Sequence, residues 1–200
     1  MISILNEKRR KGEAIQLNEL KRHEAEWYVI FVKAGSENNV LSQLEMYFDN
    51  DKIRPFIFKL EVFHKFSDKR IEKEYKIMFP GYVFVESYIT EHIFIGKIKK
   101  FIRYFNAPLK LLRYGDSCEF AMRKYEKSML QSICNMDFCV ETSIGIIQGD
   151  KTTIISGPLK GKEAFIKKID RSKRKGIIAL EFMGRMLNIT VGVDIIKKNL

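Results

Sequence analysis

The sequence predicts an α+β protein in two parts, a ferredoxin-like α-β sandwich followed by a small SH3-like all-β barrel. In the first part, aromatic and β-branched runs alternate with stretches of helical period. From Ile146 onward the pattern changes to short β-runs separated by glycines. The 200 residues, 46% of them hydrophobic, can supply cores for two small domains. The predicted division is an extension at 1–25, a first domain at 26–134, a linker at 135–145 and a second domain at 146–200.

The first predicted strand and helix follow the charged extension. Glu26–Lys33, EWYVIFVK, is rich in aromatic and β-branched side chains, as is typical of a buried strand. Gly35 ends this run, and the Ser36 hydroxyl can cap a helix that continues to about Phe48. The apolar face of this helix would pack on the sheet, with Glu37 directed outward.

A long hairpin with an interrupted second arm comes next. The alternation in Ile53–Phe66 predicts one strand, Ser67–Arg70 the turn, and Glu72–Met78 the return strand. Phe79–Tyr82, with the sequence FPGY, interrupts that return before a further strand at Val83–Glu86. Proline removes a hydrogen-bond donor from a strand, so we expect an irregular position there, with side chains that can be exposed.

Three more elements complete the first domain. Thr90 can cap a helix over Glu91–Lys100, and Ile102–Phe105 reads as a short strand. Asp116 can cap a third helix that runs to Cys134. The order strand, helix, strand, strand, helix, strand is that of the split βαβ arrangement of ferredoxin-like folds.

The second domain contains five short β-runs that suit a closed barrel. Closure would protect the strand edges of a domain with so small a core. The runs are IIQGDKTTIIS, EAFIKKI, GIIALEF, RMLNITV and DIIKK.

Several classes of protein are excluded by composition and motifs. No run of about 18 apolar residues is present and the N-terminus is unlike a signal peptide, so we expect a cytoplasmic protein without a membrane partner. Cys118, Cys134 and Cys139 lack metal-ligand spacing, which predicts reduced thiols and no metal or other cofactor. Because phosphate-loop, dinucleotide-loop, zinc-protease and nucleophile-elbow motifs are missing, we expect a binding protein without catalytic residues or enzymatic activity.

Positive charge is concentrated in the second domain. The formal net charge is +11, and residues 160–175 hold eight cations against two acids. Such cations on short turns suit phosphate contacts, and RNA is favoured over duplex DNA because no recognition helix accompanies them. A basic surface without a ligand is the alternative. The residues predicted to bind RNA are Lys160, Lys162, Arg171, Lys173, Arg174 and Lys175.

Three segments together resemble the NusG family of transcription elongation factors. WYVIFVKAGSENNVLSQLE and MFPGYVFVE resemble the NGN domain, and SGPLKGKEAFIKKID resembles the KOW motif with its central Gly161. The segments occur in the family's order and cover about residues 26–198. The basic charge, the extension and the FMGR turn are most similar to the LoaP branch, which is specialised for processive antitermination.

The resemblance implies a bacterial factor, expected as a monomer, that binds the clamp helices of RNA polymerase through its NGN domain. Binding there would suppress pausing and termination by the polymerase. The KOW domain would contact nascent RNA, such as a leader hairpin. Polymerase contacts are expected at Phe79, Tyr82, Tyr28 and Trp27. Trp27 and Tyr28 match the family's WY pair, although Trp27 is better explained as a core residue.

The turn formed by Phe182, Met183 and Arg185 matches the loop that the family uses to contact proteins, including Rho or a ribosomal protein. Two other functions remain open on the sequence. One is a general NusG-type factor for pausing and Rho-dependent termination. The other is a ribosome-associated RNA-binding protein with a KOW motif.

Overall fold

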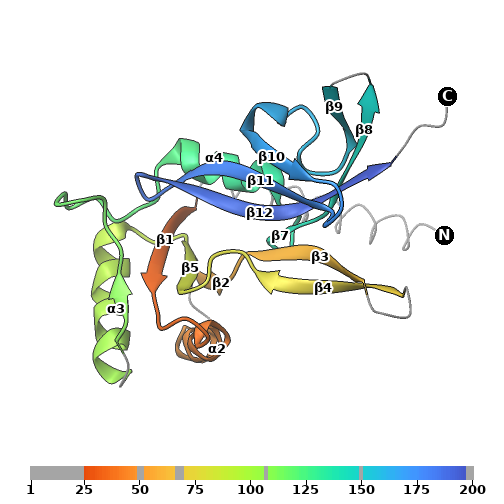
Figure 1. The fold of residues 1–200 in the computed structure, drawn as a ribbon. Coiled ribbons are helices and arrows are strands. Elements are labelled where there is room, and N and C mark those ends of the chain that lie inside the picture. Colours follow the sequence, from red (N-terminus) through yellow and green to blue (C-terminus); the bar gives the residue numbers. More distant parts are fainter. Residues whose placement is uncertain (1–24, 49–51, 66–69, 106–107, 149–150, 197–200) are drawn as a thin grey trace, which may run out of the picture.

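The computed structural model describes residues 25–48, 52–65, 70–105, 108–148 and 151–196, and they form a mixed α+β protein (Figure 1). The predicted extension at 1–25 lies outside the described residues except for Ala25. Most of the predicted turn at Ser67–Arg70 also lies outside them.

A four-stranded antiparallel sheet forms the centre of the first domain. Its strands are β1 (Glu26–Phe31), β2 (Ile53–Phe56), β5 (Tyr82–Ser87) and β6 (Lys110–Leu111), in the order β2-β5-β1-β6. This is the strand order of the predicted split βαβ arrangement. The sheet therefore follows the sequence-based expectation, although its last strand comes later in the chain than expected.

Both faces of this sheet are buried. Tyr28 and Ile30 point toward α2 (Glu37–Tyr47) and α3 (Glu91–Tyr104), and the Tyr28 ring stacks on Phe94 with 4.0 Å between ring centroids. Trp27 and Val29 point to the opposite face, toward a second core. Because alternate residues all meet apolar partners, the first strand reads as a continuous hydrophobic run.

Two predicted elements of the first domain are wrong. Ile102–Phe105 is not a strand, because α3 continues to Tyr104 with Phe101 on its buried face and Ile102 packed at the edge of the same core. The third helix is shorter than expected, since only α4 (Lys124–Ile133) is helical. Ahead of α4, the Met122 N–H donates to the Trp27 carbonyl at 2.7 Å, which keeps this segment alongside the sheet.

The predicted long hairpin strand is divided in two. After β2, the chain continues as β3 (Lys59–Lys65), which pairs with β4 (Ile71–Ile77) in a separate sheet. The third strand of that sheet is β7 (Cys139–Val140), parallel to β3. The expected linker at 135–145 therefore contributes a strand to the first domain's hairpin.

The second domain forms a five-stranded sheet in the order β10-β11-β12-β8-β9. Its strands are β8 (Ser143–Gln148), β9 (Lys151–Ser156), β10 (Ile166–Asp170), β11 (Lys175–Phe182) and β12 (Arg185–Ile196), with a short 3-10 helix at Glu163–Phe165. The two last predicted runs are one strand, β12, which pairs first with β11 and then, from Val193, with β8. No pairing of β9 with β10 occurs among the described residues, so a closed barrel is not confirmed.

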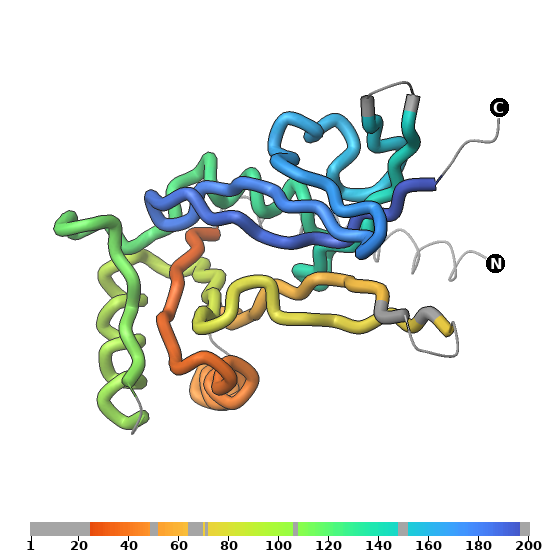
Figure 2. Tube along the Cα trace, viewed as in Figure 1, coloured from red at the N-terminus to blue at the C-terminus, as the bar shows by residue number. Residues whose placement is uncertain are grey.

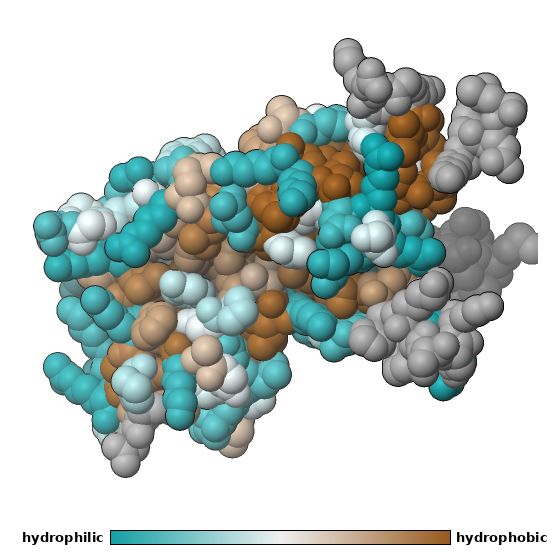
Figure 3. All heavy atoms as spheres, viewed as in Figure 1, coloured by the Kyte–Doolittle hydropathy of each residue, from teal (hydrophilic) through white to brown (hydrophobic). Residues whose placement is uncertain are grey.

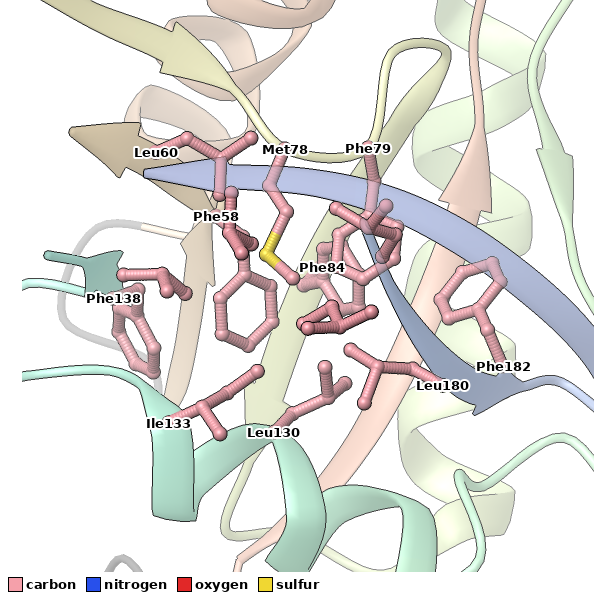
Figure 4. Packing of buried hydrophobic residues seen from close by; sticks show 14 of the residues in the cluster. Phe58, Leu60, Met78, Phe79, Phe84, Leu130, Ile133, Phe138, Leu180 and Phe182 are labelled. Atoms are coloured by element: carbon pink, nitrogen blue, oxygen red, sulfur yellow. The ribbon is translucent and has the colours of Figure 1, made fainter. Parts of the chain in front are cut away.

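One hydrophobic core joins the two predicted domains. The β11–β12 hairpin crosses the beginning of β1 and runs along β3 (Figure 2). Leu180 and Phe182 of β11 meet Phe84 of β5 and Leu130 of α4 in a single buried cluster (Figure 4). In the space-filling view, hydrophobic residues show along the middle of this face between hydrophilic residues on either side (Figure 3). The two domains are therefore packed together in this structure.

Replacing Gly157 by alanine is expected to destabilise the second domain. Gly157 has a φ of +92°, and a Cβ placed on it would lie 2.6 Å from the Ser143 Cα. Strain and clash together should lower the free energy of unfolding by about 2 kcal/mol, measured by urea denaturation. Gly161→Ala is the matched control, because Gly161 also has a positive φ, +73°, but has nothing within 4 Å of the added atom. Equal losses in both variants would contradict the clash.

Candidate functional site

An aromatic cluster lies where the two domains meet. Phe79, from the connection between β4 and β5, stacks on Phe182 at the end of β11, with 4.9 Å between centroids and 19° between planes. The Tyr82 and Phe182 rings pack in a T-shaped arrangement, with 5.2 Å between their centroids. Phe79 is 3% exposed and Phe182 is 4% exposed. The two segments singled out for protein contacts in the sequence thus contact each other.

The expected exposure of Phe79 does not hold in this arrangement, because Phe182 covers its ring. Tyr82 is half-buried, so part of it still faces solvent. Phe182 and Met183 of the predicted protein-contact turn are buried as well, while Arg185 is exposed. The roles of these residues in binding other proteins stay predictions, and most of the apolar surface they offer is occupied by the chain itself.

The FPGY turn is held in place by a buried carboxylate. Glu37, only 2% exposed, accepts hydrogen bonds from the Gly81 N–H at 2.6 Å and the Gly35 N–H at 2.8 Å. Gly81 has a φ of +87°, and its carbonyl accepts from the Val32 N–H at 2.9 Å. The outward direction expected for Glu37 is wrong, because the N–H groups of two glycine turns converge on it. These contacts fix Phe79 and Tyr82 on either side of the turn.

The turn after β11 is held by a second buried carboxylate. Glu126 of α4, 1% exposed, accepts from the Gly184 N–H at 2.9 Å and from the Tyr114 hydroxyl. The Tyr114 oxygen in turn accepts from the Arg123 N–H at 2.9 Å. Burial, together with the hydrogen bond to Glu126, raises the pKa of Tyr114 well above its ordinary value. Sequence reasoning missed Glu126 because a single acidic residue on an amphipathic helix resembles a solvated surface residue.

Trp27 and Tyr28 are core residues in this structure. Trp27 is fully buried, its Nε1–H donates to Glu86 Oε1 at 3.2 Å, and the Lys127 Nζ lies 5.5 Å from its ring. Lys127 also donates to the Ala25 carbonyl, and burial lowers its pKa. The expectation of a core position holds for Trp27. Contacts of Trp27 and Tyr28 with the polymerase stay predictions. Both side chains are buried in this structure, so such contacts would require them to become exposed.

The predicted RNA-binding cations occupy two separate turns. Lys160 and Lys162 belong to the turn after β9, and Lys162 is half-buried. The others lie in or beside the turn joining β10 to β11, where Arg171, Lys173 and Lys175 are exposed. Four of the six predicted cations are therefore exposed, as a phosphate-binding surface requires: Lys160, Arg171, Lys173 and Lys175.

Two of these cations already have acidic partners. The Arg174 Nε lies 3.4 Å from Asp194 Oδ1, and the Arg174 carbonyl accepts from the Val193 N–H at 3.1 Å. Asp170 accepts the Lys173 N–H at 3.0 Å, with the Lys173 Nζ 3.8 Å away. A hydrogen bond from the Ser172 hydroxyl, with the Lys173 N–H, lowers the pKa of Asp170. Arg174 therefore shapes the turn in addition to any contact with RNA.

Within the described part of the chain, no group of three or more His, Cys, Asp or Glu side chains is placed to hold a metal ion. Helices in the same part of the chain are too short or too polar to cross a membrane.

Three comparisons with known proteins give matches to NusG proteins. Residues 25–117 match the family model described as "NusG: Transcription termination factor nusG". A curated relative from Streptomyces coelicolor (strain ATCC BAA-471 / A3(2) / M145), "Transcription termination/antitermination protein NusG", is 27% identical over 211 residues, covering 90% of this chain and 65% of the relative. This chain thus spans less than two thirds of that relative's length. A solved structure described as "Domain interaction in Thermotoga maritima NusG" is 19% identical with a TM-score of 0.41, over 84% of this chain and 93% of that chain.

Proposed function

We propose that this chain, which carries a NusG-family domain in residues 25–117, is a non-enzymatic antitermination factor of the LoaP type. Its NGN domain, residues 26–134, binds the clamp helices of RNA polymerase and suppresses pausing and termination. Its KOW domain, residues 146–200, contacts nascent RNA through exposed cations. The factor acts as a cytoplasmic monomer.

The observation that carries the polymerase contact is the apolar surface around Phe79. This surface binds an aromatic ring of the chain's own second domain in a stacked geometry, so it can accept an apolar side chain of another protein. Buried aromatic anchors of this kind dominate the energy of protein interfaces. Binding to the polymerase would require Phe182 to withdraw, after which Phe182 and Met183 could themselves reach Rho or a ribosomal protein.

The experiment for the function is single-round transcription through a terminator, on templates with and without a candidate leader. Increased read-through only on the leader template supports the specialised antiterminator. Equal effects on every template would favour a general NusG-type factor instead. Unchanged transcription on both, with binding to ribosomes, would overturn the polymerase-centred proposal.

Charge reversal in the turn between β10 and β11 is expected to weaken binding to leader RNA. We expect Arg171→Glu, Lys173→Glu and Lys175→Glu together to lower affinity at least about tenfold and to reduce the slope of log K against log salt by about 2, because three phosphate contacts are lost. Fluorescence anisotropy across a salt series measures both quantities. Lys33→Glu, after β1, is the control, an exposed lysine in the other domain. An unchanged slope in the triple variant would contradict an RNA contact here.

A further inference from the structure

An exposed aromatic groove lies between the C-terminal ends of α2 and α3, and the proposed function makes no use of it. The two helices meet where the Tyr47 and Phe101 rings pack edge to face, 5.2 Å between centroids. Tyr104 is 82% exposed and Met46 is 75% exposed, so large apolar side chains face water here. The groove has a volume of about 250 Å³ and is lined by Gln43, Met46, Tyr47, Phe101, Tyr104 and Phe105.

Cations flank the groove along α3. Lys97 and Lys100 precede Tyr104 by seven and four residues, which places all three on one side of the helix. Lys99 and Arg103 are exposed on the adjoining side. Among the described residues that line the groove, none is acidic. An occupant that combines apolar faces with negative charge is therefore the best complement.

We infer that this groove binds a single-stranded segment of RNA. Bases would stack on the rings of Tyr104 and Tyr47, while Lys97 and Lys100 lie beside the backbone phosphates. A ring at a helix end meets the face of a base only when that base is unstacked from its neighbours, which favours a single strand over a duplex. The Gln43 amide and two phenol hydroxyls can bond the ribose 2′-hydroxyl, which favours RNA over DNA.

This surface is distinct from the cationic turns of the second domain. α3 and α2 lie on the face of the four-stranded sheet opposite the β11–β12 hairpin (Figure 1). An acidic amphipathic helix is the competing occupant, since it too joins apolar and negative groups. Such a helix needs a row of anchor pockets spaced along its apolar face, and the groove offers one small open hollow beside a protruding Tyr104.

The test removes the contribution of the cationic turn first. In the full chain carrying Arg171→Glu, Lys173→Glu and Lys175→Glu, residual affinity for a fluorescein-labelled oligouridylate of about 12 nucleotides is measured by anisotropy. Adding Tyr104→Ala should lower that affinity at least about fivefold, because stacking of one base is lost. Tyr104→Phe keeps the ring and should retain most of the binding. Tyr75→Ala is the control, a 59% exposed tyrosine on β4 that does not line the groove.

Three results would overturn the inference. The first is an affinity of the Tyr104→Ala protein equal to that of the Tyr75→Ala protein. The second is equal or tighter binding of oligothymidylate DNA. The third is an acidic amphipathic peptide that binds at Tyr104 while the oligouridylate does not. Circular dichroism checks the fold of each protein, and Met46→Ala serves as the second variant if Tyr104→Ala unfolds. Since the cationic turn is already disabled, these outcomes are independent of whether that turn binds leader RNA.

Discussion

Replacing Phe182 by alanine is expected to lower the free energy of unfolding by about 3–4 kcal/mol and to loosen the second domain from the first. Its ring is buried against Phe79, Tyr82 and Phe84, with centroids 4.9, 5.2 and 5.8 Å away. Truncation leaves a cavity where two sheets meet, and other side chains cannot refill it without moving the hairpin. Urea denaturation gives the loss of stability, and hydrogen exchange at the FPGY turn reports its opening.

The same variant separates packing from function. If Phe79 belongs to the polymerase site, then removing its cover should tighten binding to a clamp-helix fragment, because less energy is needed to reach the open form. Phe79→Ala should instead lose both stability and clamp binding. Phe165→Ala, at a 39% exposed ring of the second domain, is the control and should change neither. Weaker clamp binding by Phe182→Ala would argue against a polymerase site at Phe79.

Local patterns were enough to predict most of the elements of the fold. The aromatic run at the start of the first domain is a strand because both of its faces meet apolar partners, as the alternation of Trp27 and Tyr28 between two cores shows. Ile102–Phe105 misled because its composition suits a strand, whereas its spacing continues the apolar face of α3. The helical spacing of apolar residues along α3 therefore outweighed the strand propensity of Ile102–Phe105.

The candidate site was predicted only in part, because its decisive contacts join distant segments. FPGY was identified as an irregular turn, yet nothing in the local sequence says that Phe182 covers Phe79. Glu37 and Glu126 read as surface carboxylates, and only tertiary structure brings backbone N–H groups to them. The density of Lys and Arg in the sequence located the basic turns. It could not distinguish Arg174, which forms an ion pair with Asp194, from cations that face solvent.

Replacing Glu126 by alanine is expected to lower the free energy of unfolding by about 3 kcal/mol, because two donors lose a charged acceptor in a buried site. One is the Gly184 N–H of the hairpin turn and the other is the Tyr114 hydroxyl. The Tyr114 hydroxyl cannot turn to water, since Tyr114 is 5% exposed, whereas Gly184 lies in an exposed turn and its N–H can be hydrated in part. Urea denaturation at neutral pH measures the loss. Glu119→Ala is the matched control, since the Glu119 side chain is exposed and pairs with Arg123 at the surface, 3.3 Å away.

The same hydrogen bond predicts a dependence on alkaline pH. In the unfolded chain the Tyr114 hydroxyl ionises near its ordinary pKa of 10.0, whereas the folded protein holds the pKa of this hydroxyl well above that value. The contribution of Tyr114 to stability should therefore be constant below pH of about 10 and should fall as the pH rises further, because the unfolded state then loses a proton that the folded state keeps. Tyr114→Phe should flatten this fall in part, since burial, with the Glu91 and Glu26 charges nearby, also raises the pKa of Tyr28. A fall with the original slope in Tyr114→Phe would show that the pKa of Tyr114 is not raised in the folded protein, contrary to the prediction.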